Sequence, residues 1–324
     1  MRRVRFAPSP TGSLHVGNAL SAVANRRFGE WMLLRIDDTD PTRNVEGGEE
    51  AIVRDLEWLG VGWEEGPVHQ SARQERYREA AARLGERFDG ITLLREDGSA
   101  TYHLASVVDD VDFGITHVIR GNDHRPNEAV HRRLTQALGA SPPEYIHHGL
   151  VLGADGKKLA KRAEGATVGS LRDAGIPPEA VRRYLEELDI PVHDVHYDLS
   201  RIRRLAIEAI AAMSDDELAA RVDAPAFVAP ALRGARDLDE AREYAQLILR
   251  EPEPKHVAPE TLRRFLELAD AQPREIVREL KAVGGDLRAL RLVLTGQERG
   301  PELAAVLAAL PRDEALRRVE RSLR

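Results

Sequence analysis

Two short stretches of the chain carry residue types suited to handling a nucleotide. The first is Arg5–Asn18, RFAPSPTGSLHVGN, in which a turn rich in proline and glycine precedes His15-Val16-Gly17-Asn18. A helix beginning there offers unpaired N–H groups to a phosphate, and Gly17 lets a base or ribose approach the backbone. His15 and Asn18 are three residues apart and face the same side of such a helix. Alone, the stretch is equally compatible with an ordinary strand-to-helix turn.

The second stretch is Asp155–Arg162, DGKKLAKR, which reads as a loop after a strand. Lys158 and Lys161 are three residues apart in it. A cationic loop suits the negative charge that develops when a triphosphate is attacked at its α-phosphorus. Taken alone, the stretch is more often a solvated basic loop.

The elements that must position these stretches alternate, in the first half of the chain, between short apolar runs and helical patterns. This alternation is typical of a parallel sheet with crossover helices. The turn after the first strand then lies at the carboxyl end of that strand, where ligands bind in such sheets. We expect strands at 4–7, 31–36, 113–120 and 146–152, and helices from about 18 and at 49–59, 74–87 and 127–138, the helix at 74–87 being capped by Ser71.

From Pro177 onward nearly everything has helical period, with proline and glycine between the segments. A chain of 324 residues is long enough for two domains. We therefore predict an α/β protein: a Rossmann-type parallel-sheet catalytic domain over 1–195, followed by a mostly α-helical region over 196–324. Helices are expected at 178–188, 199–213, 215–221, 238–249, 259–269, 273–283 and 287–295.

Composition narrows the function classes. The formal net charge of −7 gives no whole-molecule attraction to nucleic acid, although a local basic face remains possible. The absence of cysteine excludes disulfides, thiolate metal sites and a cysteine nucleophile. No apolar run approaches the roughly 18 residues of a membrane span, and the basic N-terminus lacks the apolar segment of a signal peptide. We therefore expect a cytoplasmic protein without membrane association.

Two further patterns allow a metal site to be considered. His147 and His148 are neighbours on an expected strand, so they point to opposite faces and do not share a metal. They are better explained as core histidines or as histidines beside a nucleotide. The acidic run at 109–112 is expected to form a solvated turn rather than a metal site.

Together, the two stretches resemble the HIGH and KMSKS signatures of class I aminoacyl-tRNA synthetases. Further blocks resemble those of glutamyl-tRNA synthetases and cover most of residues 1–190, and the segment at 289–320 resembles the end of that family's C-terminal domain. The chain is identified as a shortened member of this family. The blocks are RFAPSPTGSLHVGNA, LLRIDDTDPTRN, DLEWLGVGWEEGP, TYHLASVVDD, GITHVIRGNDH and GADGKKLAKR.

The resemblance implies ATP-dependent ligation of L-glutamate to tRNA(Glu) through a glutamyl-adenylate intermediate. Such an enzyme is expected to use ATP with Mg²⁺ and to act as a monomer. No zinc is expected, because the cysteines that bind it in some relatives are missing here.

The resemblance also carries roles over to individual residues. Arg5 and Arg120 are expected to hold the carboxylates of glutamate, because a guanidinium can bind a carboxylate through two hydrogen bonds. His15, Lys158 and Lys161 are the expected catalytic residues, and no metal ligand is expected. The glutamate pocket is predicted to comprise Arg5, Ala7, Ser9, Asp37, Tyr102, Ser106 and Arg120. The ATP site is predicted to comprise His15, Gly17, Asn18, Asp123, His124, Lys158, Leu159 and Lys161.

The sequence departs from the family pattern at four positions and in two longer segments. The stretch at about 77–101 leaves room only for a reduced acceptor-binding insertion, and the region over 196–324 is short for tRNA contacts and resembles a truncated anticodon-binding domain. The four positions are Asp37 for a glutamate, Ser106 for an asparagine, Asn18 for the second glycine that the family usually shows in its first signature, and Ala160 for a serine.

Three alternatives stay open. A glutamyl-queuosine tRNA(Asp) synthetase is a shorter relative that glutamylates a modified base. A paralogue could pass activated glutamate to an acceptor other than tRNA. A catalytically inactive RNA-binding or regulatory protein could share the fold, although the intact charged residues of the site argue against it.

Overall fold

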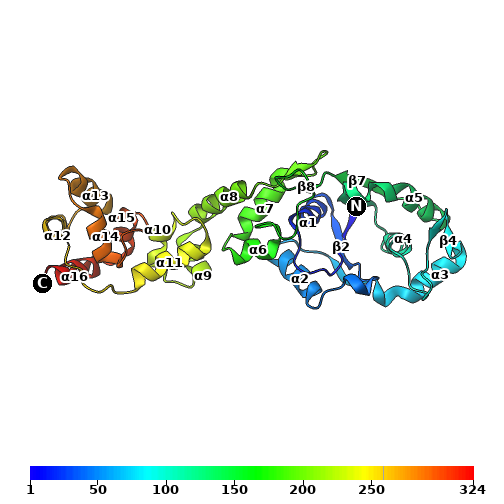
Figure 1. Cartoon of the computed structure of the whole chain (residues 1–324), viewed down its shortest axis with the longest axis horizontal. Helices are drawn as coiled ribbons and strands as arrows, with labels where there is room; N and C mark the ends of the chain where they lie inside the picture. The colour runs from blue at the N-terminus through cyan, green and yellow to red at the C-terminus, as the bar shows by residue number, and fades with distance from the viewer. Residues whose placement is uncertain (258) are drawn as a thin grey trace. The chain divides into compact units, whose positions relative to one another are not determined.

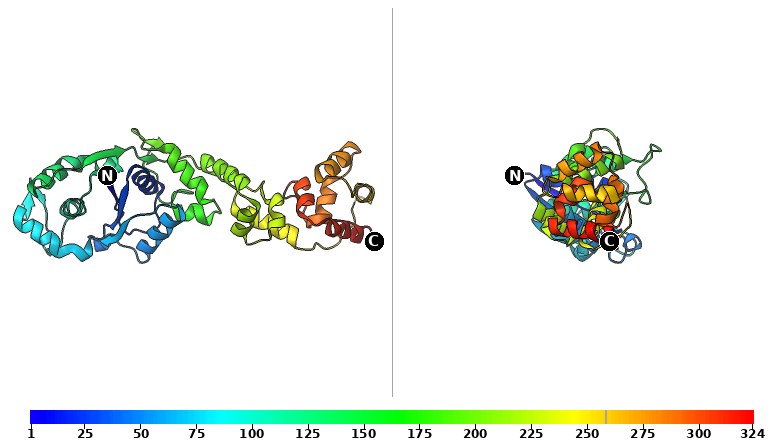
Figure 2. Two further views of the ribbon diagram at one scale, coloured as in Figure 1. Left: turned by 180° about the vertical axis from the view of Figure 1, so that it is seen from behind. Right: turned by 90° about the vertical axis from the view of Figure 1, so that its left-hand side faces the viewer.

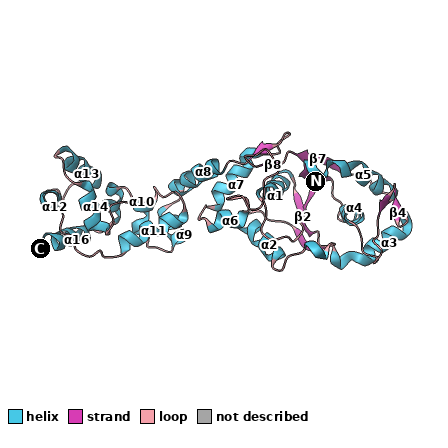
Figure 3. Cartoon of the chain, viewed as in Figure 1, coloured by secondary structure: helices cyan, strands magenta, loops and turns pink. Residues whose placement is uncertain are grey.

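The computed structural model describes residues 1–257 and 259–324 and divides the chain into two compact units (Figure 1). The first unit comprises residues 1–173 and 181–199, and the second comprises 174–180 and 200–324. In the described part of the chain, strands occur only in the first unit, as the magenta segments of Figure 3 show. The predicted fold class, a parallel-sheet α/β unit followed by a mostly helical region, is confirmed.

Parallel strands form the centre of the first unit. Three of them pair in the order β1-β2-β3, and a second parallel pair is formed by β6 and β7. The backbone N–H of Thr116 donates to Arg3 O over 2.9 Å, which brings the start of β6 beside β1. The strands are β1 (Arg3–Phe6), β2 (Trp31–Ile36), β3 (Glu65–His69), β4 (Arg87–Phe88), β5 (Ile91–Thr92), β6 (His117–Gly121), β7 (Glu144–His148), β8 (Val151–Leu152) and β9 (Val195–His196).

Helices of the first unit connect these strands. Helix α1 lies against β1 and β6 (Figures 1 and 2), and its apolar face buries Leu20 and Val23. The helical segments are α1 (Val16–Phe28), η1 (Pro41–Arg43), α2 (Gly48–Trp58), η2 (Ser71–Arg73), α3 (Gln74–Leu84), α4 (Tyr102–Asp112), η3 (Asn122–Asn127), α5 (Glu128–Ala137) and α6 (Val168–Asp173), and α7 (Pro178–Leu188) begins in the second unit and continues in the first.

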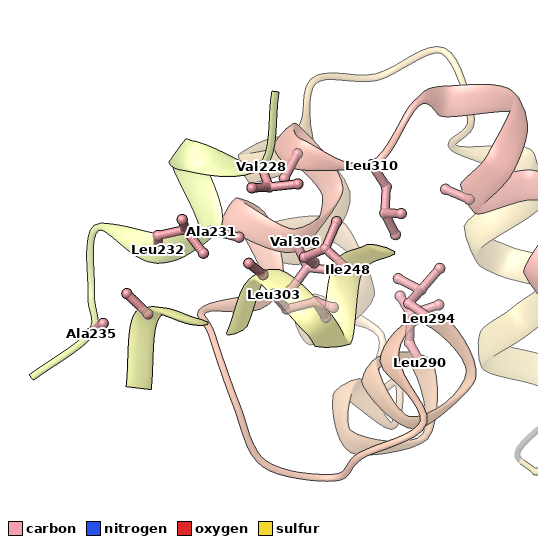
Figure 4. Packing of buried hydrophobic residues seen from close by; sticks show 14 of the residues in the cluster. Val228, Ala231, Leu232, Ala235, Ile248, Leu290, Leu294, Leu303, Val306 and Leu310 are labelled. Atoms are coloured by element: carbon pink, nitrogen blue, oxygen red, sulfur yellow. The ribbon is translucent and has the colours of Figure 1, made fainter. Parts of the chain in front are cut away.

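The second unit is a helical assembly with its own apolar core. Helices α10 and α15 pack there, with Leu232, Leu303 and Val306 fully or almost fully buried (Figure 4). Its elements are α8 (Leu199–Ala212), α9 (Asp215–Val222), η4 (Ala226–Val228), α10 (Ala229–Leu232), α11 (Leu238–Leu249), α12 (Pro259–Glu267), α13 (Pro273–Ala282), α14 (Leu287–Thr295), α15 (Leu303–Ala309) and α16 (Arg312–Leu323).

Sequence periodicity missed α4 entirely. The acidic run at 109–112, expected in a solvated turn, is the end of this helix, and Asp109 and Asp110 are buried. The strand expected at 113–120 begins only at His117, because Phe113 still closes the last turn of α4. Burial of the acidic residues is possible because arginines from other elements pair with them.

Other features also differ from the predicted ones, and the helix expected at 74–87 ends at Leu84, where Gly85 follows with a positive φ. The strand expected at 146–152 is two strands, because the backbone of His193 and Asp194 approaches Gly149 so closely that a side chain would not fit there. Ser71 does not cap α3; it lies in η2, and its N–H and hydroxyl both donate to the carboxylate of Asp38.

The segment between α3 and α4 is compact. It holds the short antiparallel pair of β4 and β5 and a further bridge between Leu94 and Ala100. Leu93 and Tyr77 are fully buried in the apolar cluster that joins this segment to α4 and α5. No helix in the described part of the chain has the length and apolar character needed to cross a membrane.

Candidate active site

His15 caps the N-terminus of α1. Its backbone is extended, and its Nδ1 accepts a hydrogen bond from the N–H of Gly17 over 3.1 Å. Burial lowers the pKa of His15, an interaction with the backbone of Leu159 opposes this shift, and the positive charges of Lys158 and Lys161 lower the pKa further. The ring is therefore neutral, with its proton on Nε2. That buried Nε2–H donor has no hydrogen-bond partner within the described structure.

Asp55 of α2 holds the turn that leads into α1. Its side chain is fully buried and accepts hydrogen bonds from Ser13 Oγ at 2.6 Å and from the N–H of Leu14 at 2.8 Å. Arg172 of α6 donates to the other carboxylate oxygen at 2.8 Å. A buried carboxylate with three donors is well satisfied, so this contact fixes the position of His15 at the helix start.

The basic loop after β8 is tied to this turn. Lys161 Nζ donates to the carbonyl oxygen of Thr11 at 3.2 Å and to its hydroxyl at 3.0 Å. Lys158 Nζ lies 2.6 Å from Asp123 Oδ2 of η3, and Leu159 between the two lysines is buried. Two stretches about 140 residues apart in sequence thus surround the same helix start.

Two buried arginines lie near the ends of β1 and β6, and we refer to the residues around them as the arginine pocket. Arg5 and Arg120 are each only 6% exposed. Arg120 donates from Nη1 to the hydroxyl of Tyr102 and from Nε to Nε2 of His147, each over 3.3 Å. Burial lowers the pKa of Arg120, and the nearby charge of Arg5 lowers it further. Arg5 Nε and Arg120 Nη2 are buried donors that lack a hydrogen-bond partner within the described chain.

Arg35 of β2 lies beside this pocket and is only 1% exposed. It donates from Nε and Nη2 to the two carboxylate oxygens of Asp37, at 2.7 and 3.2 Å, and from Nη1 to Asp110 at 3.0 Å. Its Nη2 also lies 3.5 Å from the hydroxyl of Ser106. Arg35 is thus fully paired, whereas Arg5, 3.3 Å from Asp110, keeps a donor without a directed hydrogen bond.

Comparison with known proteins identifies the family. The family model described as tRNA synthetases class I (E and Q), catalytic domain, matches residues 1–87 and 85–206. This chain belongs to that family. It is 33% identical to glutamate–tRNA ligase 1 of Rubrobacter xylanophilus, covering 99% of this chain and 97% of that protein. It is 30% identical to the glutamate–tRNA ligase of Akkermansia muciniphila, with 98% of each covered.

The fold agrees with this assignment. A crystal structure of a glutamate tRNA ligase from Elizabethkingia meningosepticum superposes with a TM-score of 0.77 at 21% identity, covering 99% of each chain. The alignment with the Rubrobacter protein extends over 421 positions, more than the 324 residues of this chain. Segments of that relative therefore have no counterpart here, and the prediction of a shortened member of the synthetase family is confirmed.

The structure brings most of the predicted residues of this synthetase into two groups. Arg5, Arg120 and Tyr102 lie together, and Arg35 links Asp37 and Ser106 to them through Asp110. Ala7 and Ser9 are half-buried in the turn after β1, next to the same strand end. His124 was predicted beside the nucleotide, and its Nδ1 lies 3.3 Å from the Tyr102 hydroxyl, on the side of the arginine pocket.

The second group surrounds the start of α1. It contains His15, Lys158, Leu159 and Lys161, with Asp123 bound to Lys158. Gly17 lies in the first turn of the helix, and Asn18 is exposed there. The roles predicted for these residues remain predictions.

Several residues of the site escaped the sequence analysis. Buried ion pairs join Arg35 to Asp109 and Asp110 next to the arginine pocket. His147 accepts a hydrogen bond from Arg120. An arginine inside each of the two apolar strands, Arg5 in β1 and Arg35 in β2, was an available signal, since buried arginines require carboxylates nearby. No group of three or more histidine, aspartate or glutamate side chains in the described chain could hold a metal ion.

Proposed function

We propose that this chain ligates L-glutamate to tRNA(Glu), activating the amino acid with ATP. The observation that carries the proposal is the pair of buried guanidinium nitrogens that make no directed hydrogen bond within the described chain, Arg5 Nε, which lies 3.3 Å from Asp110, and Arg120 Nη2. Buried charged donors of this kind are costly unless a ligand completes them. Two of them side by side fit an amino acid with two carboxylates.

The charges around the arginine pocket support a substrate with two carboxylates. Asp37, Asp109 and Asp110 are each close to Arg35, and Arg73 and Arg5 bring further positive charge beside Asp109 and Asp110. Arg120 has no carboxylate partner within the described chain, and Arg5 keeps Nε without a directed hydrogen bond, so both can bind substrate carboxylates. An amino acid with only one carboxylate would leave one of these buried guanidinium donors without a hydrogen bond, and this cost supplies selectivity.

The residues around α1 fit a nucleoside triphosphate. The unpartnered Nε2–H of His15 is a donor to the nucleotide, and the ammonium groups of Lys158 and Lys161 suit its phosphates. Because the described chain offers no cluster of metal ligands, Mg²⁺ would be held mainly by the phosphates themselves. Bound Mg²⁺ would supply neutralisation of phosphate charge.

The reaction places modest chemical demands on the protein. The α-carboxylate of glutamate forms a bond to the α-phosphorus of ATP, and pyrophosphate leaves. A hydroxyl of the terminal ribose of tRNA then attacks the activated carbonyl, and AMP leaves. Neither step needs a protein nucleophile, so the arginines position the amino acid while the lysines stabilise charge on the leaving group.

The accessory parts of the enzyme follow from the same proposal. We assign the catalytic domain to 1–195, with the hairpin within 77–101 as a reduced acceptor-binding insertion. We assign tRNA contacts, including those of a truncated anticodon-binding region, to 196–324. Such an enzyme would work in the cytoplasm, and we expect a monomer.

The relatives favour tRNA charging over the alternatives. Both curated relatives are glutamate–tRNA ligases that align over 97% or more of their own length, including the C-terminal region. A glutamyl-queuosine synthetase or a paralogue with another acceptor is therefore not favoured.

The test is charging of purified tRNA(Glu), tRNA(Gln) and queuosine-containing tRNA(Asp) with labelled glutamate, ATP and Mg²⁺. We expect alkali-labile label on the terminal ribose of tRNA(Glu). Label in the anticodon loop of tRNA(Asp) would assign the chain to the queuosine reaction. Release of AMP and pyrophosphate without label on any tRNA would indicate a different acceptor.

A further inference from the structure

The guanidinium of Arg120 is held at two of its three nitrogens. Nη1 donates to the Tyr102 hydroxyl and Nε donates to His147 Nε2. The guanidinium is planar and rigid, so fixing two nitrogens fixes the direction of the third. That third nitrogen, Nη2, is the one without a partner in the described structure.

His147 can accept this hydrogen bond in only one protonation state. It is the direct cross-strand partner of Arg120 in the β6–β7 pair, and its side chain is almost fully buried. Accepting from Arg120 requires a free lone pair on Nε2, so the ring proton must lie on Nδ1. Nδ1 is 3.5 Å from Glu128 Oε2, which makes that carboxylate the neighbour able to favour this tautomer.

The surroundings of His147 keep it neutral. Burial and the charge of Arg120 lower its pKa to about 4, against the opposing effect of Glu128. Arg125 and His124 also face the ring and lower its pKa. A protonated ring would turn a second N–H donor toward Arg120, so the hydrogen bond would be lost and replaced by repulsion.

We propose that His147 is a positioning residue that orients the guanidinium of Arg120 toward a carboxylate of glutamate, with Glu128 selecting the required tautomer. The inference rests on the proposed function, because it takes glutamate as the ligand of Arg120. Glu128 is itself held by Arg132, whose Nε lies 2.7 Å from Oε1. A chain of contacts therefore runs from the surface of α5 to the substrate pocket.

Tyr145 completes this arrangement on the same face of β7. Its ring lies nearly parallel to that of His147, at an interplanar angle of 9°. The guanidinium carbon of Arg120 lies 5.1 Å from the centre of the Tyr145 ring, and that of Arg132 lies 4.9 Å from it. Tyr145 thus supports the guanidinium through cation–π contact, while His147 sets its direction.

The experiment is calorimetric titration of L-glutamate into the full chain at pH 7. His147→Phe keeps a flat ring but removes the acceptor, and we expect the Kd for glutamate to rise about tenfold, the size of one lost hydrogen bond to a charged group. His147→Gln restores an acceptor near the position of Nε2, so its Kd should stay within about threefold of wild type. ATP binding should not change in either variant.

The matched control is His117→Phe, the same substitution in the β6–β7 pair away from the pocket. His117 contacts Phe28 and lies near Glu144, and its replacement should leave the glutamate Kd unchanged. The proposal is overturned if His147→Phe binds glutamate as tightly as wild type, or if His147→Gln binds as weakly as His147→Phe. If Arg120→Ala no longer binds glutamate while His147→Phe binds it normally, the role of Arg120 stands and only the positioning role of His147 is refuted. Absence of glutamate binding in wild type would instead overturn the proposed function, and the positioning role with it.

A second measurement reads the tautomer of His147 in the wild-type protein itself. In wild-type protein labelled with ¹⁵N-histidine, the ring shifts of His147, assigned by comparison with His147→Gln, report which nitrogen carries the proton. We expect protonation at Nδ1 alone at pH 7. Protonation at Nε2 would be incompatible with the hydrogen bond from Arg120 and would refute the proposal.

Discussion

Arg120→Ala is the substitution that tests the glutamate pocket most directly. The wild-type guanidinium is 6% exposed, is held by two side chains and has one free donor. Truncation would leave a substrate carboxylate buried beside Arg5 alone. Loss of one partner of a buried charge pair costs about 2–5 kcal/mol. At 1.4 kcal/mol per factor of ten, glutamate binding should weaken by roughly thirtyfold to several thousandfold.

The companion variant Arg120→Lys separates charge from geometry. Lysine keeps the positive charge but lacks the planar fork, so its effect should be intermediate. Glutamate affinity is measured by calorimetry, and the KM for glutamate is measured in the charging reaction. The rise in melting temperature that glutamate gives the wild type should be absent in Arg120→Ala, because a ligand stabilises only in proportion to its binding. A glutamate Kd or KM equal to that of wild type would refute the clamp.

Three further predictions follow from other parts of the site. Asp55→Asn should lower the free energy of unfolding by about 2–3 kcal/mol, since a buried carboxylate with three donors is lost. Denaturant titration measures this free energy, and a change below about 0.5 kcal/mol would contradict the prediction. Lys161→Ala should lower the rate of adenylate formation about a hundredfold with an unchanged glutamate Kd, whereas Lys157→Ala in the same loop should change neither. The pKa of His147 is about 4 in the folded protein and 6.5 in the unfolded chain. Between these pH values the unfolded state binds more protons, so the stability that His147 contributes is fully present above pH 6.5 and is lost as the pH falls toward 4. We expect the free energy of unfolding to fall by about 2 kcal/mol between pH 7 and pH 5 from this residue. His147→Gln should lose this share of the pH dependence, and an unchanged slope would disprove it.

The strands and helices with regular apolar spacing were predictable from the sequence. Strand β2 and helices α11 and α14 have the boundaries that the pattern predicted. Strand β2 is an almost continuous apolar run, and the two helices repeat their apolar residues at helical spacing and begin at a capping aspartate, Asp237 before α11 and Asp286 before α14. Local sequence therefore contained the information that determines them.

The buried carboxylates could not be predicted in the same way. Asp109 and Asp110 interrupt the apolar face of α4, and acidic side chains are almost never buried unless paired. Their partners, Arg5 and Arg35, come from β1 and β2, about 75 or more residues earlier in the chain. Only the tertiary structure brings these charges together, so a local reading assigned the run to solvent.

Pairing also distinguishes Arg35 from the two arginines that we propose to bind glutamate. The three arginines of the site, Arg5, Arg35 and Arg120, have the same chemistry and similar burial. Residue type alone therefore does not show which of them binds the substrate. Arg35 is hydrogen-bonded to Asp37 and Asp110, so a ligand carboxylate would have to compete with protein carboxylates for it. Arg5 and Arg120 each retain an unused buried donor, and the energetic cost of that donor is recovered only when an anion binds. Ligand binding is therefore expected at the arginines that the fold leaves incompletely paired.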